Sequence, residues 1–265
     1  MSQPTLLSYR SLIWNFAQRD LKARFKGTAV GWGWSLAVPL ASLLIYALVF
    51  GLLFRAPPPN FGSGHKGNFA AWLFVGLTVW GFFANGINTA IGALLGAGPL
   101  LKKIYFPAYA PVIGSIIAVA IQSLIEVVLV LGTMLAFGNI GFSWLLVPIW
   151  AVVFAAFVTA LSLVLSIANI YLRDLSHIVS VALQLFFYAT PIMFPASLLS
   201  GHPTLQRVIS ANPMSQFVEI FRDLVYGLTP GAWGAWLYIL GWSAVIIAIS
   251  AWAFGRFGRD LGEQL

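Results

Sequence analysis

The residues that could do chemistry in this chain are few and lie far apart. Glu126 is the only acidic residue well inside a long apolar segment, and Gln122 precedes it by one helical turn on the same face. His65, His177 and His202 show no metal-ligand spacing, and no Ser/His/Asp set is evident. Cysteine is absent, which excludes thiol nucleophiles, thiolate metal sites and disulfides. The sequence therefore indicates neither catalysis nor a metal site.

The chain also has no phosphate loop of the form GxxxxGKS or GxxxxGKT, so it cannot hydrolyse ATP by that route. A carboxylate inside an apolar segment is costly unless it faces protein or water, which makes Glu126 a functional candidate. The alternative is a structural hydrogen bond to a neighbouring helix. Asn85, Asn88 and Asn169 fit both interpretations.

The elements that must position these residues are long apolar segments. A bilayer core needs about 20 helical residues to cross, and an unpaired peptide group in lipid is costly, so each segment predicts a transmembrane helix. Six such segments cover residues 28–54, 69–95, 107–137, 142–170, 177–199 and 235–254. Apolar residues make up 60% of the chain and charged residues 8%, too few to cover a soluble core. We expect one all-α, six-span transmembrane domain over 1–265, with no cleaved signal peptide.

The basic residues predict the orientation of these spans, because basic loops tend to stay in the cytoplasm. Four basic residues fall in the odd-numbered loops, against ten in the tails and even-numbered loops. The four are Arg55, Lys66, Arg207 and Arg222; the ten are Arg10, Arg19, Lys22, Arg24, Lys26, Lys102, Lys103, Arg173, Arg256 and Arg259. We therefore expect both termini, 1–27 and 255–265, to be cytoplasmic. This asymmetry accounts for most of the net charge of +7, so no nucleic-acid partner is expected.

A helical period runs through residues 6–26 and separates apolar from basic positions. This pattern predicts an amphipathic helix that lies in the membrane interface. A simple basic anchor is the alternative at this stage.

Four separated stretches resemble the permeases of type-2 ABC exporters, in the branch that exports polysaccharides. They are residues 19–40 (RDLKARFKGTAVGWGWSLAVPL), 100–112 (LLKKIYFPAYAPV), 169–195 (NIYLRDLSHIVSVALQLFFYATPIMFP) and 212–227 (NPMSQFVEIFRDLVYG). The four matches follow one another along nearly the whole chain. Their combination is therefore more specific than any single stretch.

The resemblance implies that the cytoplasmic segments contact a separate ATPase subunit, which would bind ATP and Mg²⁺ while this chain holds no cofactor. The coupling residues would be Arg19, Lys22, Lys102, Lys103, Tyr105, Phe106, Arg173 and Asp174. The alternatives are snorkelling lysines with aromatic interface anchors, and a local capping turn at 173–174.

Two short helical patterns, 204–210 and 215–226, separate the fifth and sixth apolar segments. Neither is long enough to cross a membrane, so we expect an external pair that dips into the membrane or lies along it. The resemblance implies an external gate formed by Pro195, Asn212, Pro213, Phe217 and Phe221. An ordinary amphipathic surface hairpin is the alternative.

Aromatic residues make up 15% of the chain. Many must belong to the interfacial belt or the core, but sugar rings present C–H faces that stack on aromatic rings. The resemblance therefore implies that a translocation path runs along some of Trp32, Trp34, Trp72, Trp80, Phe83, Phe187 and Tyr188. We also place Glu126 on this path, as the carboxylate inside a span.

We interpret the chain as the non-enzymatic permease of an exporter in the bacterial plasma membrane. It would pair with a second copy and two ATPase subunits, and move a lipid-linked polysaccharide such as an O antigen, teichoic acid or capsule outward. A type-2 exporter of a small drug or lipid is the main alternative. A membrane-embedded glycan enzyme and a proton-coupled flippase, the latter because of Glu126, are further ones.

Overall fold

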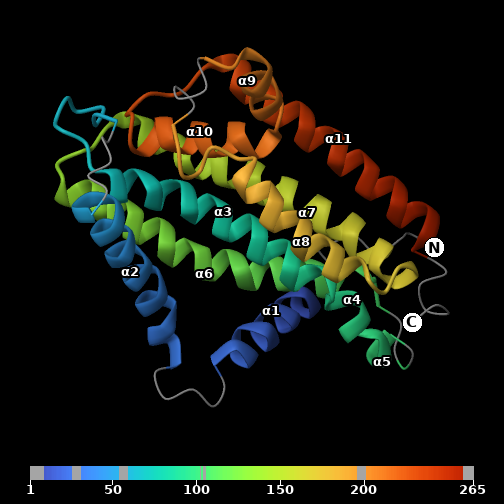
Figure 1. Cartoon of the computed structure of the whole chain (residues 1–265). Coiled ribbons are helices and arrows are strands. Elements are labelled where there is room, and N and C mark those ends of the chain that lie inside the picture. Colours follow the sequence, from blue (N-terminus) through green and yellow to red (C-terminus); the bar gives the residue numbers. More distant parts are fainter. Residues whose placement is uncertain are drawn as a thin grey trace.

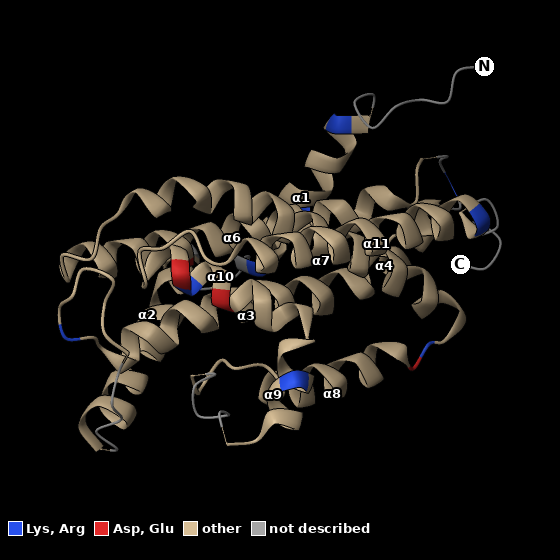
Figure 2. Cartoon of the chain, turned by 90° about the horizontal axis from the view of Figure 1, so that it is seen from above, with Lys and Arg blue, Asp and Glu red and all other residues tan. Residues whose placement is uncertain are grey.

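The chain folds into a bundle of long helices with shorter helices at its two ends (Figure 1). The computed structural model describes residues 9–25, 31–53, 59–101, 103, 106–195 and 201–258. Five helical segments are long and apolar enough to cross a membrane: Trp34–Leu53, Phe69–Ile91, Tyr109–Ala136, Phe142–Tyr171 and Trp233–Phe257. The prediction of an all-helical polytopic membrane protein is confirmed. Figure 2 shows these long helices almost free of charged residues.

The first span consists of α2 (Trp34–Tyr46) and the π-helical turns η3 (Ala47–Leu53). The next two spans are α3 (Phe69–Ile91) and α6 (Tyr109–Ala136), and the short helices α4 (Ala93–Gly96) and α5 (Gly98–Leu101) lie between them. The 3-10 turn η4 (Phe142–Leu146) leads into α7 (Val147–Tyr171), and α11 (Trp233–Phe257) is the last span. All five lie close to the predicted apolar segments.

The predicted span at 177–199 is a shorter helix than expected. Helix α8 (Leu175–Tyr188) has 14 residues, about 21 Å of rise against the roughly 30 Å of a hydrocarbon core. It ends three residues before Pro191, whose ring disfavours helical geometry in the residue before it. Residues 189–195 continue as turns, and 196–200 lie outside the described residues.

Two short helices follow, where the sequence predicted them: α9 (Pro203–Ser210) and α10 (Pro213–Val225). Helix α10 packs against α3, α7 and α11 and is almost completely buried, although it is too short to span a membrane. Its inward face is apolar, and Phe217 and Phe221 have no exposed surface. A helix that ends inside such a core must find partners for its last carbonyl groups.

Side chains from other elements supply these partners. The Asn139 side-chain amide donates to the carbonyl oxygens of Val225 (3.0 Å) and Tyr226 (2.9 Å). The Ser143 hydroxyl donates to the carbonyl of Leu224 at 2.6 Å. In return, the Asn139 carboxamide oxygen accepts from the backbone N–H of Ser63 at 3.1 Å. One asparagine therefore joins α10 to the loop before α3.

We expect Asn139→Ala to lower the stability of the chain by about 1–3 kcal/mol, because it leaves buried backbone groups without partners. The measurement is the thermal unfolding midpoint of the purified protein in a mild detergent. Asn60→Ala is the matched control, since Asn60 is exposed. Equal midpoints for the two variants would contradict this role of Asn139.

Candidate functional site

A cleft of about 480 Å³ lies between α3 and α8. Its wall combines three aromatic rings with two amides and a hydroxyl, and we call it the α3–α8 cleft. The lining residues are Trp80, Ala84, Asn88, Ser180, Leu183, Gln184, Phe187 and Tyr188. Clefts of this size that combine apolar walls with a few polar groups are typical of binding sites.

Helical spacing explains why these residues meet. Trp80, Ala84 and Asn88 are four residues apart on α3, so they share one face of that helix. On α8, Ser180 and Gln184 are spaced in the same way and continue to Tyr188. The Ser180 hydroxyl donates to the Asn88 side-chain oxygen at 3.0 Å, which joins the two helices.

The aromatic rings of the cleft contact one another in a row. The Trp80 and Phe187 ring centroids are 5.5 Å apart with the rings nearly perpendicular, and those of Phe187 and Tyr188 are 5.3 Å apart. Tyr188 is 71% exposed, so its ring is available to a partner outside this chain. Flat rings beside amide and hydroxyl groups suit a polyhydroxylated ligand, which has both C–H faces and hydroxyl groups.

The other residues predicted for the path lie elsewhere. Phe83 contacts Trp80 but is buried and stacks on Phe157 in the core, and Trp72 is also buried. Trp34 is half-exposed on α2, and the side chain of Trp32 is outside the described residues. Of the residues predicted for the path, the cleft therefore brings together Trp80, Phe187 and Tyr188.

Glu126 lies on α6 beside Gly81 of α3 and is not among the residues that line the cleft. Within the described part of the chain it makes no hydrogen bond or ion pair that would account for its burial. Gln122, one turn earlier, does have a partner: its side-chain oxygen accepts from Arg24 at 2.7 Å.

Helix α1 (Arg10–Phe25) docks across the start of α6. Its apolar face is buried, and the Phe16 ring lies 5.7 Å from that of Phe106, in the segment between α5 and α6. A Cβ added at Gly114 of α6 would lie 2.5 Å from the Phe16 Cβ, which shows how closely the two helices approach. Gly114 therefore permits this docking.

Polar contacts fix the position of α1 on the bundle. The Ser115 hydroxyl donates to the Asp20 carboxylate at 2.6 Å. Arg24 donates to the Gln122 side-chain oxygen on α6 and, at 2.9 Å, to the Thr89 hydroxyl on α3. Burial lowers the pKa of the Arg24 guanidinium, and the nearby Asp20 carboxylate raises it. A single cation thus joins α1 to two spans.

The predicted coupling residues that the structure describes lie on α1, in the segment after α5 and in the turn after α7. Lys22 and Lys103 are exposed, and Arg19 pairs with the neighbouring Asp20 at 3.1 Å. Arg173 and Asp174 are exposed in the turn between α7 and α8. That turn is tied to the end of α3, because Asn169 donates to the Ile91 carbonyl and accepts from the Ser176 N–H. Lys102 and Tyr105 lie outside the described residues.

The predicted gate residues lie around α10. Asn212 caps this helix by accepting from the Met214 N–H at 2.9 Å, and its amide donates to the Thr190 hydroxyl at 3.0 Å after α8. Pro213 is the first helical residue, and Phe217 contacts Trp150 of α7. Pro195 ends the described segment after α8.

Arg222 holds α10 to the end of α8 from inside the core. Its guanidinium donates to the carbonyls of Pro191 (2.5 Å) and Ile192 (2.6 Å) and lies 3.6 Å from the centre of the Trp72 ring on α3. Burial lowers the Arg222 pKa to about 10, and Glu219 at 3.7 Å raises it, so the group stays charged at neutral pH. Sequence reasoning assigned Arg222 only to a loop and gave it no such role.

Known proteins similar to this chain match it over most of its length. A family model described as ABC-2 type transporter matches residues 11–226. The O-antigen export system permease protein RfbA of Myxococcus xanthus is 31% identical over 226 residues, which cover 83% of this chain and 82% of that protein. A protein of the same description from Klebsiella pneumoniae is 26% identical over 235 residues, 88% of this chain and 87% of that protein.

We expect Gly114→Leu to displace α1 from α6, because overpacking a close helix contact costs about 1–3 kcal/mol. The chain has no cysteine, so Ala17→Cys, at a fully buried position of α1, provides a single thiol for labelling. A water-soluble maleimide should label this thiol slowly in the parent protein and quickly in the Gly114→Leu background. Gly132→Leu is the control, since a Cβ there meets nothing within 4 Å. Equal labelling rates in the two backgrounds would disprove the contact.

Proposed function

Since this chain belongs to the ABC-2 type transporter family, we propose that it is the permease of an exporter that moves a lipid-linked polysaccharide, of the O-antigen class, out of the cytoplasm. The chain is a membrane permease, and in such systems ATP hydrolysis belongs to a separate subunit. The names of the relatives from Myxococcus xanthus and Klebsiella pneumoniae support the cargo class.

The α3–α8 cleft is the observation that carries the cargo assignment. Trp80, Phe187 and Tyr188 offer ring faces for sugar rings, and Asn88 and Gln184 offer amides for hydroxyl groups. An exporter of a small apolar drug or lipid would gain nothing from two amides in its path, because an apolar cargo cannot form hydrogen bonds with them. The cleft therefore favours a glycan over that alternative.

A second copy of the chain would complete the pathway. In this proposal the second copy packs against α2 and against α8, which lines the cleft. Leu44 on α2 and Leu185 on α8, each 69% exposed, would be covered there. A channel between two copies would place the open side of each α3–α8 cleft toward the cargo. Two ATPase subunits would complete the transporter.

The proposed topology has six crossings, with α8 and the turns that follow it forming the fifth. Both termini would then be cytoplasmic in the plasma membrane of a bacterium, as the basic residues predict. Helix α1 would lie in the cytoplasmic interface, and α9 and α10 would form a re-entrant external pair. In this arrangement Pro195, Asn212, Pro213, Phe217 and Phe221 belong to the external gate.

Motion of the ATPases would reach the spans through α1 and the two cytoplasmic turns. Arg24 supports this route because it holds both α3 and α6, so a shift of α1 acts on two spans at once. The exposed basic residues Lys22, Lys103 and Arg173 would contact the ATPase surface. ATP and Mg²⁺ would bind to that partner alone.

The proposed function is tested with the chain and the ATPase encoded beside it, purified together in lipid. We expect two copies of each subunit and ATP hydrolysis that a lipid-linked glycan stimulates. Stimulation by small amphiphiles but not by the glycan would indicate the drug or lipid exporter instead. Failure to form any complex with an ATPase would overturn the proposal.

We expect Trp80→Ala to raise the glycan concentration for half-maximal stimulation roughly two- to tenfold, as the loss of one aromatic contact predicts. Trp80→Phe should restore most of the affinity, because it keeps a ring. Trp233→Ala is the control, since Trp233 is 81% exposed at the start of α11. Unchanged half-maximal concentrations in all three variants would remove the cleft from the pathway.

A further inference from the structure

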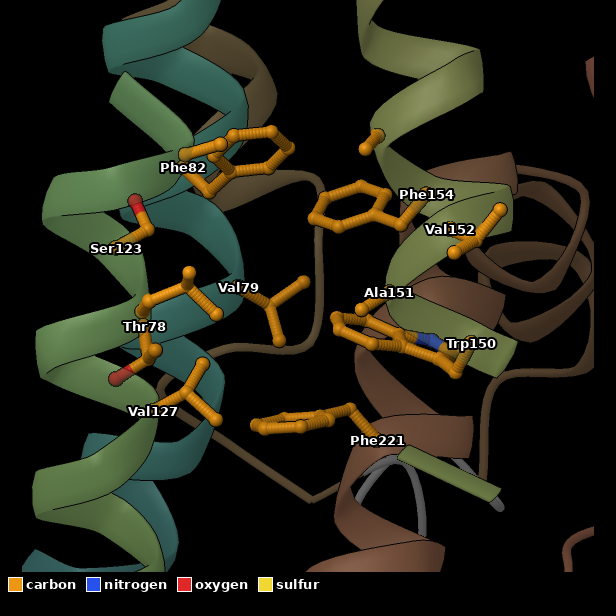
Figure 3. Close-up of a pocket in the computed structure, with 13 residues that line it drawn as sticks. Thr78, Val79, Phe82, Ser123, Val127, Trp150, Ala151, Val152, Phe154 and Phe221 are labelled. Carbon is orange, nitrogen blue, oxygen red and sulfur yellow. The ribbon is translucent and has the colours of Figure 1, made fainter. Parts of the chain in front are cut away.

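A second cavity, of about 230 Å³, lies among α3, α6, α7 and α10 (Figure 3). We call it the α6–α7 cavity. Its wall is almost entirely apolar, with Val79 and Phe82 from α3, Val127 from α6, Trp150 and Phe154 from α7, and Phe221 from α10. In Figure 3 these side chains point from the four helices toward a common space.

The cavity opens between two spans. Leu124 of α6 and Val152 of α7 line it, and these side chains are 58% and 69% exposed. Because both belong to membrane-spanning segments, the opening continues into the hydrocarbon-facing surface of the bundle. Apolar cavities of about 150 Å³ already stay free of water and bind molecules such as benzene. An apolar wall that opens toward hydrocarbon therefore favours a hydrocarbon chain as the ligand of this cavity.

The position of the cavity helps to decide whether its hydrocarbon chain belongs to a resident lipid or to a transported one. Thr78 and Phe82 line the cavity, whereas Trp80, Ala84 and Asn88 line the α3–α8 cleft. At about 100° per residue, these two sets lie on opposite faces of α3. A chain in the cavity is thus separated by a whole helix from the candidate cargo path, which favours a resident lipid over a transported one.

We propose that the α6–α7 cavity binds one acyl chain of a membrane phospholipid as a fixed part of the packing around α10. The chain would touch both Trp150 and Phe221, whose rings stack with centroids 4.5 Å apart. Trp150 also donates from its indole N–H to the Phe217 carbonyl at 3.1 Å. The acyl chain therefore supports the two contacts that seat α10 against α7. This inference does not depend on the identity of the cargo.

The test uses the full chain in phospholipid vesicles that contain a phospholipid with a photoreactive group in one acyl chain. We expect cross-links on the peptides that carry Leu124 and Val152. Ala151→Phe, which fills the cavity from α7, should abolish these cross-links, and so should Ala120→Leu, a smaller change made from α6. Ala248→Phe is the control, because Ala248 is exposed on α11 outside the cavity; its cross-links at Leu124 and Val152 should persist.

Three outcomes would overturn the proposal. Cross-links spread evenly over the apolar surface of the parent protein would show that no chain is held. Cross-links that persist in both filling variants would place the bound chain elsewhere. Labelling of the cavity by a photoreactive polyprenyl phosphate, with displacement of the phospholipid, would assign the site to the cargo carrier instead.

Discussion

The structure depends on keeping a short helix buried in apolar surroundings. Helix α10 cannot leave its last carbonyl groups unpaired, because the apolar side chains that bury it offer them no hydrogen bonds. Asn139 and Ser143 supply donors to these carbonyl groups, and Trp150 donates to the Phe217 carbonyl in the middle of the helix. From α10 itself, Arg222 reaches the carbonyls after α8. Each partner comes from a distant part of the sequence. The loop before α3, the end of α6, the start of α7 and the turn after α8 are therefore held around one helix.

Helix α3 connects this arrangement to the other end of the bundle. Near its start, Trp72 packs against the Arg222 guanidinium, and Gly76 leaves room for it. Its middle carries the aromatic and polar wall of the α3–α8 cleft. Near its end, Thr89 accepts from Arg24 of α1. One rigid helix therefore contacts the seat of α10, the candidate cargo surface and the docked amphipathic helix.

The elements with a strong periodic signal were predicted well from the sequence. Long apolar runs determine where a chain can cross a bilayer, so five spans matched, and the two short helices before α11 were also expected. The fifth apolar run was misjudged in length, because apolar composition continues beyond Tyr188 although the helix does not. Within the cleft, Trp80, Phe187 and Tyr188 were predicted, while Ser180 and Gln184 were missed despite their four-residue spacing. The contacts of Arg24 and Arg222 join residues distant in sequence, so no local pattern could indicate them.

The two hollow spaces of the molecule share α3 as a common wall. A substitution that displaced α3 toward α8 would therefore narrow the cleft and widen the cavity together, because α3 lines both spaces. The packing against α10 and the space at the candidate cargo surface therefore both depend on the position of one helix.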